Sequence, residues 1–177
     1  MQENQAIELN EQIQSLMNQG KWLDAIELVQ KDVELLQNSY QLSWNIGWCF
    51  FKLDRNKEAR KHLLQACKLN PGSAVSHWAI GTIYLKLGQY KMAEASLKKA
   101  LRIKDSHLAR SALAFTYHTQ GNIDEAERIH LEGLKLKQDD WNRYKSYACF
   151  LSDVGREEEA QQMNRKARNL KRGKKQS

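Results

Sequence analysis

Small and large apolar residues recur along this chain with a period of about 34 positions. A column of mostly small residues holds Ile13, Gly47, Gly81, Ala114 and Ala148, at successive spacings of 34, 34, 33 and 34 residues. Three positions after each member stands a large apolar residue, in turn Leu16, Phe50, Tyr84, Tyr117 and Leu151. Twelve positions after each member stands an alanine, in turn Ala25, Ala59, Ala93, Ala126 and Ala160. Apolar positions three and four apart indicate amphipathic helices, so we expect the same helical unit to be built repeatedly.

Each unit has a turn residue seven positions after the small column, in turn Gly20, Asp54, Gly88, Gly121 and Gly155. A break at this point divides each unit into two helices. We expect ten helices, over 4–19, 22–36, 40–53, 56–69, 74–87, 90–103, 107–120, 123–136, 141–154 and 157–171. No alternating apolar pattern is long enough to predict a strand, and a single proline leaves the helices uninterrupted.

The pattern resembles the tetratricopeptide repeat, a helix-turn-helix unit with small residues where its two helices touch. The second and third copies match it best, through Ile46, Gly47, Phe50, Ala59, Leu63, Ala66 and Pro71, and through Ile80, Gly81, Tyr84, Gly88, Tyr90, Ala93, Leu97 and Ala100. Ile13 in the small column and His130 at a usually apolar position depart from the family pattern. The resemblance implies an all-α, right-handed α-solenoid over residues 1–172, with repeats at 6–39, 40–73, 74–106, 107–140 and 141–172.

Positive charge is concentrated at the end of the chain. The chain has 28 basic and 21 acidic residues, for a formal net charge of +7. Seven of the basic residues lie in a C-terminal extension at 165–177 that contains no acid, namely Arg165, Lys166, Arg168, Lys171, Arg172, Lys174 and Lys175. The remaining repeat body is therefore balanced in charge.

The chain shows no sign of export, metal binding or catalysis. It has neither a basic start followed by an apolar run nor a stretch long enough to span a bilayer, so we expect a cytoplasmic protein without a membrane span. Its three cysteines have no zinc-ligand spacing, and we expect no cofactor or metal. No phosphate-binding loop or nucleophile motif occurs, and a pairing of Cys149 with His118 would lack an orienting acid, so we expect no enzyme.

The first of the two helices in each repeat has two stripes. One stripe packs against the second helix of the repeat, and the other remains for binding. In the tetratricopeptide family this second stripe lines the concave groove in which peptides bind. Here it is aromatic in the middle of the chain, and the candidate groove residues are Trp44, Asn45, Trp48, Phe51, Lys52, Trp78, Thr82, Leu85, Lys86, Phe115 and His118. Trp44 and Trp48 lie one helical turn apart, and we expect Trp78 on the first helix of the next repeat, at the level of Trp44.

The groove predicts an adaptor or scaffold that binds a peptide or helix of another protein through apolar anchors. Two other interpretations of the aromatic residues remain open. The rings can fill gaps between successive helices, or a terminal segment or second copy of the chain can cover them, which would make a homo-oligomer.

The basic extension also has three interpretations. It can be the solvated polar end that a repeat array requires, it can dock an acidic partner, or it can contact the phosphates of nucleic acid or anionic lipid in a salt-dependent way.

Overall fold

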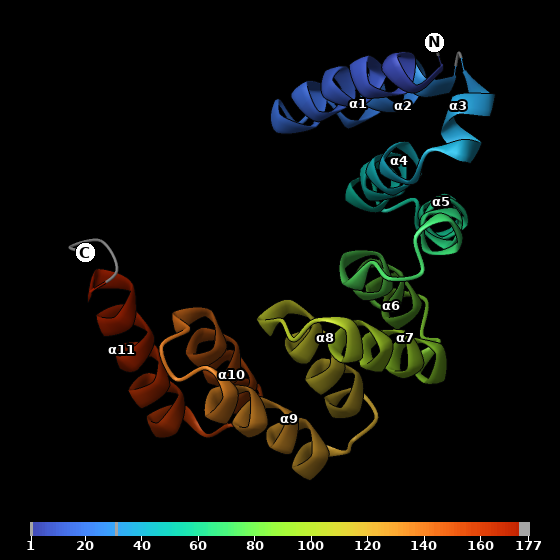
Figure 1. The fold of residues 1–177 in the computed structure, drawn as a ribbon. Coiled ribbons are helices and arrows are strands. Elements are labelled where there is room, and N and C mark those ends of the chain that lie inside the picture. The colour runs from blue at the N-terminus through green and yellow to red at the C-terminus, as the bar shows by residue number, and fades with distance from the viewer. Residues whose placement is uncertain (1, 31, 174–177) are drawn as a thin grey trace. The chain divides into compact units, whose positions relative to one another are not determined.

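The computed structural model describes residues 2–30 and 32–173, and every regular element in these ranges is an α-helix. The chain divides after Ile103 into two compact units, which we describe separately. The first unit contains α1 (Gln2–Asn18), α2 (Trp22–Gln30), α3 (Val33–Asn38), α4 (Tyr40–Lys52), α5 (Asn56–Leu69), α6 (Ala74–Lys86) and α7 (Tyr90–Ile103). The second contains α8 (His107–His118), α9 (Ile123–Leu136), α10 (Trp141–Asp153) and α11 (Glu157–Gly173). The prediction of an all-α fold is confirmed (Figure 1).

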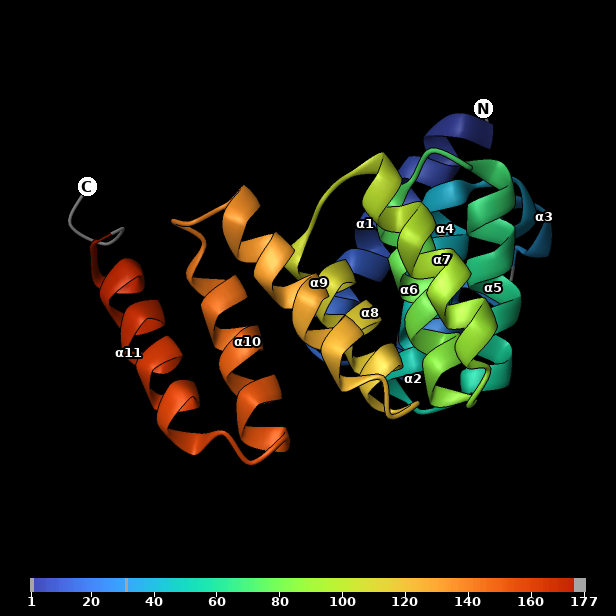
Figure 2. The same ribbon diagram turned by 90° about the horizontal axis from the view of Figure 1, so that it is seen from below.

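Helices that follow one another in the chain pack as pairs within each unit. In the first unit α1 packs against α2, α4 against α5 and α6 against α7. In the second unit α8 packs against α9 and α10 against α11, and Figures 1 and 2 both show α10 and α11 side by side. These pairs are the helix-turn-helix units that the period of the sequence predicts.

The small column lies where the two helices of a pair come closest. A Cβ atom on Gly47 would stand 2.7 Å from Cγ of Leu63, and one on Gly81 would stand 2.7 Å from Cγ of Leu97. The alanine column is equally enclosed, with exposed fractions between 0 and 3 %. A larger side chain at either column would push the paired helices apart, because protein interiors are close-packed and have no space for additional atoms.

The five turn positions share one backbone conformation. Gly20, Gly88, Gly121 and Gly155 have φ between 69° and 80°, and Asp54 has φ 59°. Glycine enters this left-handed region without a steric penalty, whereas a residue with a Cβ does so at a cost. Asp54 is therefore the exception among the turns, and its side chain has a contact that the glycines cannot make.

The predicted helix 22–36 is instead two helices, α2 and α3. The carboxylate of Asp32 accepts a hydrogen bond from the backbone N–H of Leu35 at 3.1 Å and begins α3 as its N-cap. The hydroxyl of Ser43 donates to the carbonyl of Leu36 at 2.7 Å, which ties α3 to α4. Helical periodicity does not predict this break, because an aspartate in the pattern is equally compatible with a solvent-exposed position inside one continuous helix.

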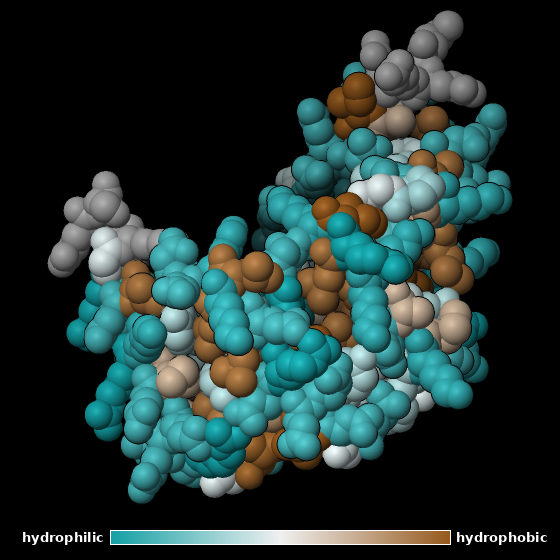
Figure 3. Space-filling view, turned by 60° about the horizontal axis from the view of Figure 1, so that its bottom comes forward, coloured by the Kyte–Doolittle hydropathy of each residue, from teal (hydrophilic) through white to brown (hydrophobic). Residues whose placement is uncertain are grey.

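The surface mixes apolar and hydrophilic side chains. On the face drawn in Figure 3, apolar groups in brown are small and lie among hydrophilic groups in teal. In the described part of the chain, none of the helices combines the length and the hydropathy needed to cross a bilayer.

Candidate functional site

Helix α4 holds the centre of the candidate site. Its first turn is fixed by Ser39, whose hydroxyl accepts a hydrogen bond from the backbone N–H of Leu42 at 3.4 Å. One face of the helix is fully enclosed through Leu42, Ile46 and Cys49, each at most 1 % exposed. Burial raises the pKa of the Cys49 thiol to about 12, so this cysteine is a packing residue and not a nucleophile. The opposite face carries Trp44 and Trp48.

Four aromatic rings of α4 and α6 form a continuous cluster, which we call the tryptophan surface and define as Trp44, Trp48, Phe51 and Trp78. The rings of Trp44 and Trp48 are stacked, with centroids 5.7 Å apart and planes 8° from parallel. Trp48 also contacts Phe51 at 5.0 Å and Trp78 at 5.6 Å between centroids. Trp78, expected at the level of Trp44, lies against Trp48, one turn further along α4, and all four side chains are partly exposed.

Two lysines hold their ammonium groups over these rings. Nζ of Lys52 lies 5.2 Å from the centroid of Trp48 and 6.0 Å from that of Trp22. Nζ of Lys86 lies 4.8 Å from the centroid of Phe51 and bonds Asp54 at 2.8 Å. Within the described residues Lys52 has no ion-pair partner, whereas Lys86 pairs with Asp54.

The contact with Lys86 accounts for an aspartate at a turn position that is glycine in the other four repeats. The Asp54 carboxylate accepts from Lys86 Nζ and from the side-chain amide of Asn56 at 3.0 Å. These hydrogen bonds, first the one from Lys86, hold the pKa of the Asp54 carboxyl below its usual value. The side chain that a glycine would lack fixes the position of Lys86 over Phe51.

Three further candidate residues in the first unit have contacts within the chain. Asn45 is only 4 % exposed, and its amide donates to Oδ1 of Asn10 at 2.7 Å. The hydroxyl of Thr82 donates to the carbonyl of Trp78 at 3.0 Å, and Leu85 is partly buried. The side-chain amide of Asn45 thus joins α4 to α1 through Asn10.

The candidate residues of the second unit belong to a different cluster. Phe115 on α8 is 48 % exposed. The ring of His118 is edge-on to Phe115, with centroids 6.2 Å apart, and to Phe150 on α10, with centroids 5.8 Å apart. His118 thus packs α8 against α10, and the structure does not bring it together with the tryptophan surface in one described unit.

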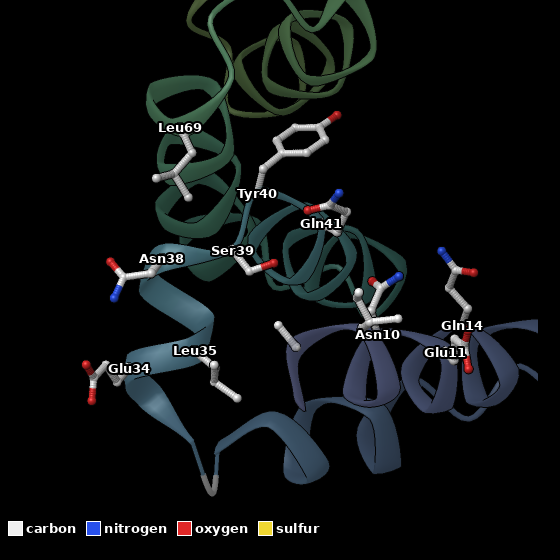
Figure 4. A pocket seen from close by; sticks show the side chains of 12 residues that line it. Asn10, Glu11, Gln14, Glu34, Leu35, Asn38, Ser39, Tyr40, Gln41 and Leu69 are labelled. Carbon is white, nitrogen blue, oxygen red and sulfur yellow. The ribbon is translucent and has the colours of Figure 1, made fainter. Parts of the chain in front are cut away.

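A pocket lies beside the N-terminal end of α4. Its volume is about 730 Å³, and it lies between α1, α3, α4 and Leu69 of α5 (Figure 4). Its described lining includes the polar side chains of Asn10, Glu11, Gln14, Glu34, Asn38 and Gln41, and Figure 4 shows Leu35 of α3 pointing toward α1. We call this the N-terminal pocket. Gln41, which lines the pocket, lies about one turn before Trp44 on the same face of α4.

Sequence reasoning missed Trp22 and most of this pocket. Trp22 begins α2, a second helix of a pair, whereas the candidate stripe was taken from first helices alone. The pocket depends on α3, which periodicity does not predict. The signal that was available is the carboxamide content of the stripe at Asn10, Gln14 and Gln41.

The basic extension is partly helical and partly packed. Lys166 Nζ lies 4.8 Å from the centroid of Tyr144, and Lys171 Nζ lies 4.5 Å from that of Trp141. Arg165, Arg168 and Arg172 are exposed on α11. The predicted residues Lys174 and Lys175 lie outside the described residues. The first five cations thus belong to the last helix of the second unit.

Comparison with known proteins gives a family and a fold. Two tetratricopeptide repeat families match, one at residues 10–74 and the other at 84–148, and together they cover more than two thirds of the chain. No curated protein sequence matches the chain.

Solved structures with the same arrangement of helices include MamA proteins. A crystal structure of MamA protein superposes with a TM-score of 0.73 at 17 % identity, over 97 % of this chain and 94 % of that one. A MamA fragment from Desulfovibrio magneticus RS-1 gives 0.73 at 16 % identity, over 95 % and 96 % of the two chains. At such identities the likeness shows the fold alone.

Proposed function

Because this chain belongs to the tetratricopeptide repeat family, whose repeats support a role as a protein-interaction scaffold, we propose that its first unit binds an apolar segment of a partner protein on the tryptophan surface. The single observation that carries this proposal is the cluster itself. Trp48 contacts Trp44, Phe51 and Trp78 at centroid distances of 5.0 to 5.7 Å, yet all four rings keep part of their area open.

The physical argument rests on the cost of leaving aromatic area in water. Removing apolar surface from water stabilises a complex by about 25 cal/mol per Å². Tryptophans are over-represented among the residues that dominate binding energy, and the loss of one such anchor costs roughly 2 kcal/mol or more. Rings already held by stacking lose little side-chain entropy on binding, which makes them efficient anchors.

An affinity capture from native lysate tests the proposal with three baits: the wild type, Trp44→Ala/Trp48→Ala and Trp141→Ala. Trp141 is the matched control, because it is a partly exposed tryptophan at the start of α10 in the second unit. We expect a protein that the wild type and Trp141→Ala retain and the double variant loses. Calorimetry with that protein should then show at least a tenfold weaker Kd for the double variant.

Circular dichroism at matched temperature checks that the double variant remains folded. A folded double variant that retains the same proteins as the wild type would refute the tryptophan surface as the binding site.

A further inference from the structure

Resting on the proposed function, we propose that the bound segment is bipolar: it presents an acidic group to Lys52 and a basic group to the N-terminal pocket, with apolar residues on the tryptophan surface between them. The structure carries this through charge complementarity at the two ends of one face of α4.

The acidic group of the ligand is indicated by Lys52. Its ammonium lies over Trp48 and Trp22, so a partner that buries these rings also removes water from the ammonium. A cation that loses water without gaining an anion is costly, because desolvation disfavours the charged form. Lys86 beside it already has Asp54, whereas Lys52 has no such anion among the described residues. An acidic group on the partner would supply one.

The basic group of the ligand is indicated by the N-terminal pocket. The charged side chains among its described lining are Glu11 and Glu34, both exposed, and neither is in an ion pair with a described residue. Asn10, Gln14 and Gln41 add carboxamides, which donate to and accept from a peptide backbone. The volume of about 730 Å³ is ample for the end of a peptide with a long basic side chain.

The distance between the two ends sets the length of the segment. Gln41 and Lys52 are eleven residues apart on a helix, which corresponds to about 16 Å along its axis. An extended peptide covers that length in about five residues; because alternate side chains lie on one side, a span of six residues, about 20 Å, puts both ends on that side and reaches past Gln41 into the pocket. A segment with charges at its first and seventh positions and apolar residues at the third and fifth would meet the pocket, the rings and Lys52 from one face.

Synthetic peptides test this directly on the full chain. The probe is acetyl-Lys-Ser-Leu-Ser-Phe-Ser-Glu-amide, and its matched control carries Gln at both ends. Their Kd values would be measured by titration, following the tryptophan indole N–H signals by NMR at low salt. Two exposed charge pairs should make the charged peptide bind about fivefold tighter. Lys52→Gln and Glu11→Gln/Glu34→Gln should each remove part of that advantage, so that the ratio of the Kd values for the neutral and the charged peptide falls toward one.

The outcomes separate this inference from the proposed function. Equal affinities for both peptides, each weakened by Trp44→Ala/Trp48→Ala, would overturn the bipolar ligand and leave the tryptophan surface as a binding site. Failure of both peptides to bind at millimolar concentration would contradict both proposals. Sedimentation of the chain alone provides the last outcome: self-association abolished by the tryptophan variant would place a second copy on the surface and overturn a separate partner segment.

Discussion

The two units are built from the same helical pair but use charged residues differently. In the first unit Lys52, Lys86 and Asp54 lie on the surface around partly exposed rings. In the second unit Arg143 on α10 is 4 % exposed and bonds Asp105 and the carbonyl of Gly133. The charged groups of the first unit thus remain at the exposed surface, whereas the enclosed guanidinium of the second unit holds helices together. A repeat pattern thus fixes how helices pair and leaves each surface free to specialise.

The largest effect we expect on stability is at Arg143. Its guanidinium pairs with Asp105 and with Asp140 at 3.3 Å, and donates to Gly133 at 3.2 Å. Arg143→Ala would remove the enclosed guanidinium that joins these three acceptors and leave a cavity in its place, so it should reduce the free energy of unfolding by about 3 kcal/mol. Urea denaturation gives the value, and hydrogen exchange should localise the loss to α8–α10.

Arg128→Ala is the control for that loss. Like Arg143, Arg128 pairs with two carboxylates, here those of Glu125 and Glu132, but it is exposed on α9. It should change the free energy of unfolding by less than about 1 kcal/mol. Equal losses in the two variants would contradict the structural role assigned to Arg143.

A second effect should appear on acidification, through His130 of the second unit. Burial lowers the pKa of this imidazole from 6.5 to about 4. As pH falls below 6.5, the imidazole of His130 is protonated in the unfolded chain, whereas in the folded chain it stays neutral until about pH 4. The free energy of unfolding should therefore decrease across that window, by about 3 kcal/mol in total.

His130→Leu should remove this part of the pH dependence, since leucine fills the site without a charge to bury. Comparing urea midpoints of wild type and variant at pH 7.5 and pH 4.5 isolates it from other groups. Parallel losses of stability in the two proteins would show that His130 is not the source.

A third effect, about 1 to 3 kcal/mol, should follow Gly133→Ala. A Cβ there would lie 2.8 Å from Cδ of Arg110 and 3.0 Å from Nη1 of Arg143, so the enclosed arginine would be displaced. Thermal unfolding measures the loss. In Arg143→Ala the same glycine substitution should cost less, and additive losses in the double variant would disprove the coupling of Gly133 to Arg143.

The smallest effect should be at Asp54. Asp54→Gly replaces the one strained turn residue by the residue of the other four turns, and removes an exposed ion pair with Lys86. Relief of the left-handed backbone offsets the lost pair, so stability should stay within about 1 kcal/mol of wild type. A loss of unfolding free energy as large as that of Arg143→Ala would contradict the different roles given to charged residues in the two units.

Periodicity predicted most of the fold because each helix pair repeats the same physical requirement. Gly47 and Gly81 are small where leucines cross, and the alanine column is enclosed throughout. The division into α2 and α3 was not predictable, because it depends on the cap at Asp32 and on the bond from Ser43.

The candidate site was predictable only as far as one helix defines it. Helical spacing alone places Trp44 and Trp48 a turn apart, whereas the repeat predicted Trp78 at the level of Trp44 and the structure has it against Trp48. The position of Lys52 over Trp22, the pair of Asn45 with Asn10 and the N-terminal pocket join residues of different helices. No spacing within one helix encodes those contacts.

The sequence by itself determined the family, the helix pairs and the aromatic stripe, since these follow from local geometry repeated every 34 residues or so. The tertiary structure alone decided which polar groups are enclosed and which remain open. Gly133 has no evident role in the sequence, yet in three dimensions it makes room for Arg143. The physical reason is that the cost of burying a polar or charged group depends on every neighbour around it, and those neighbours come from distant parts of the chain.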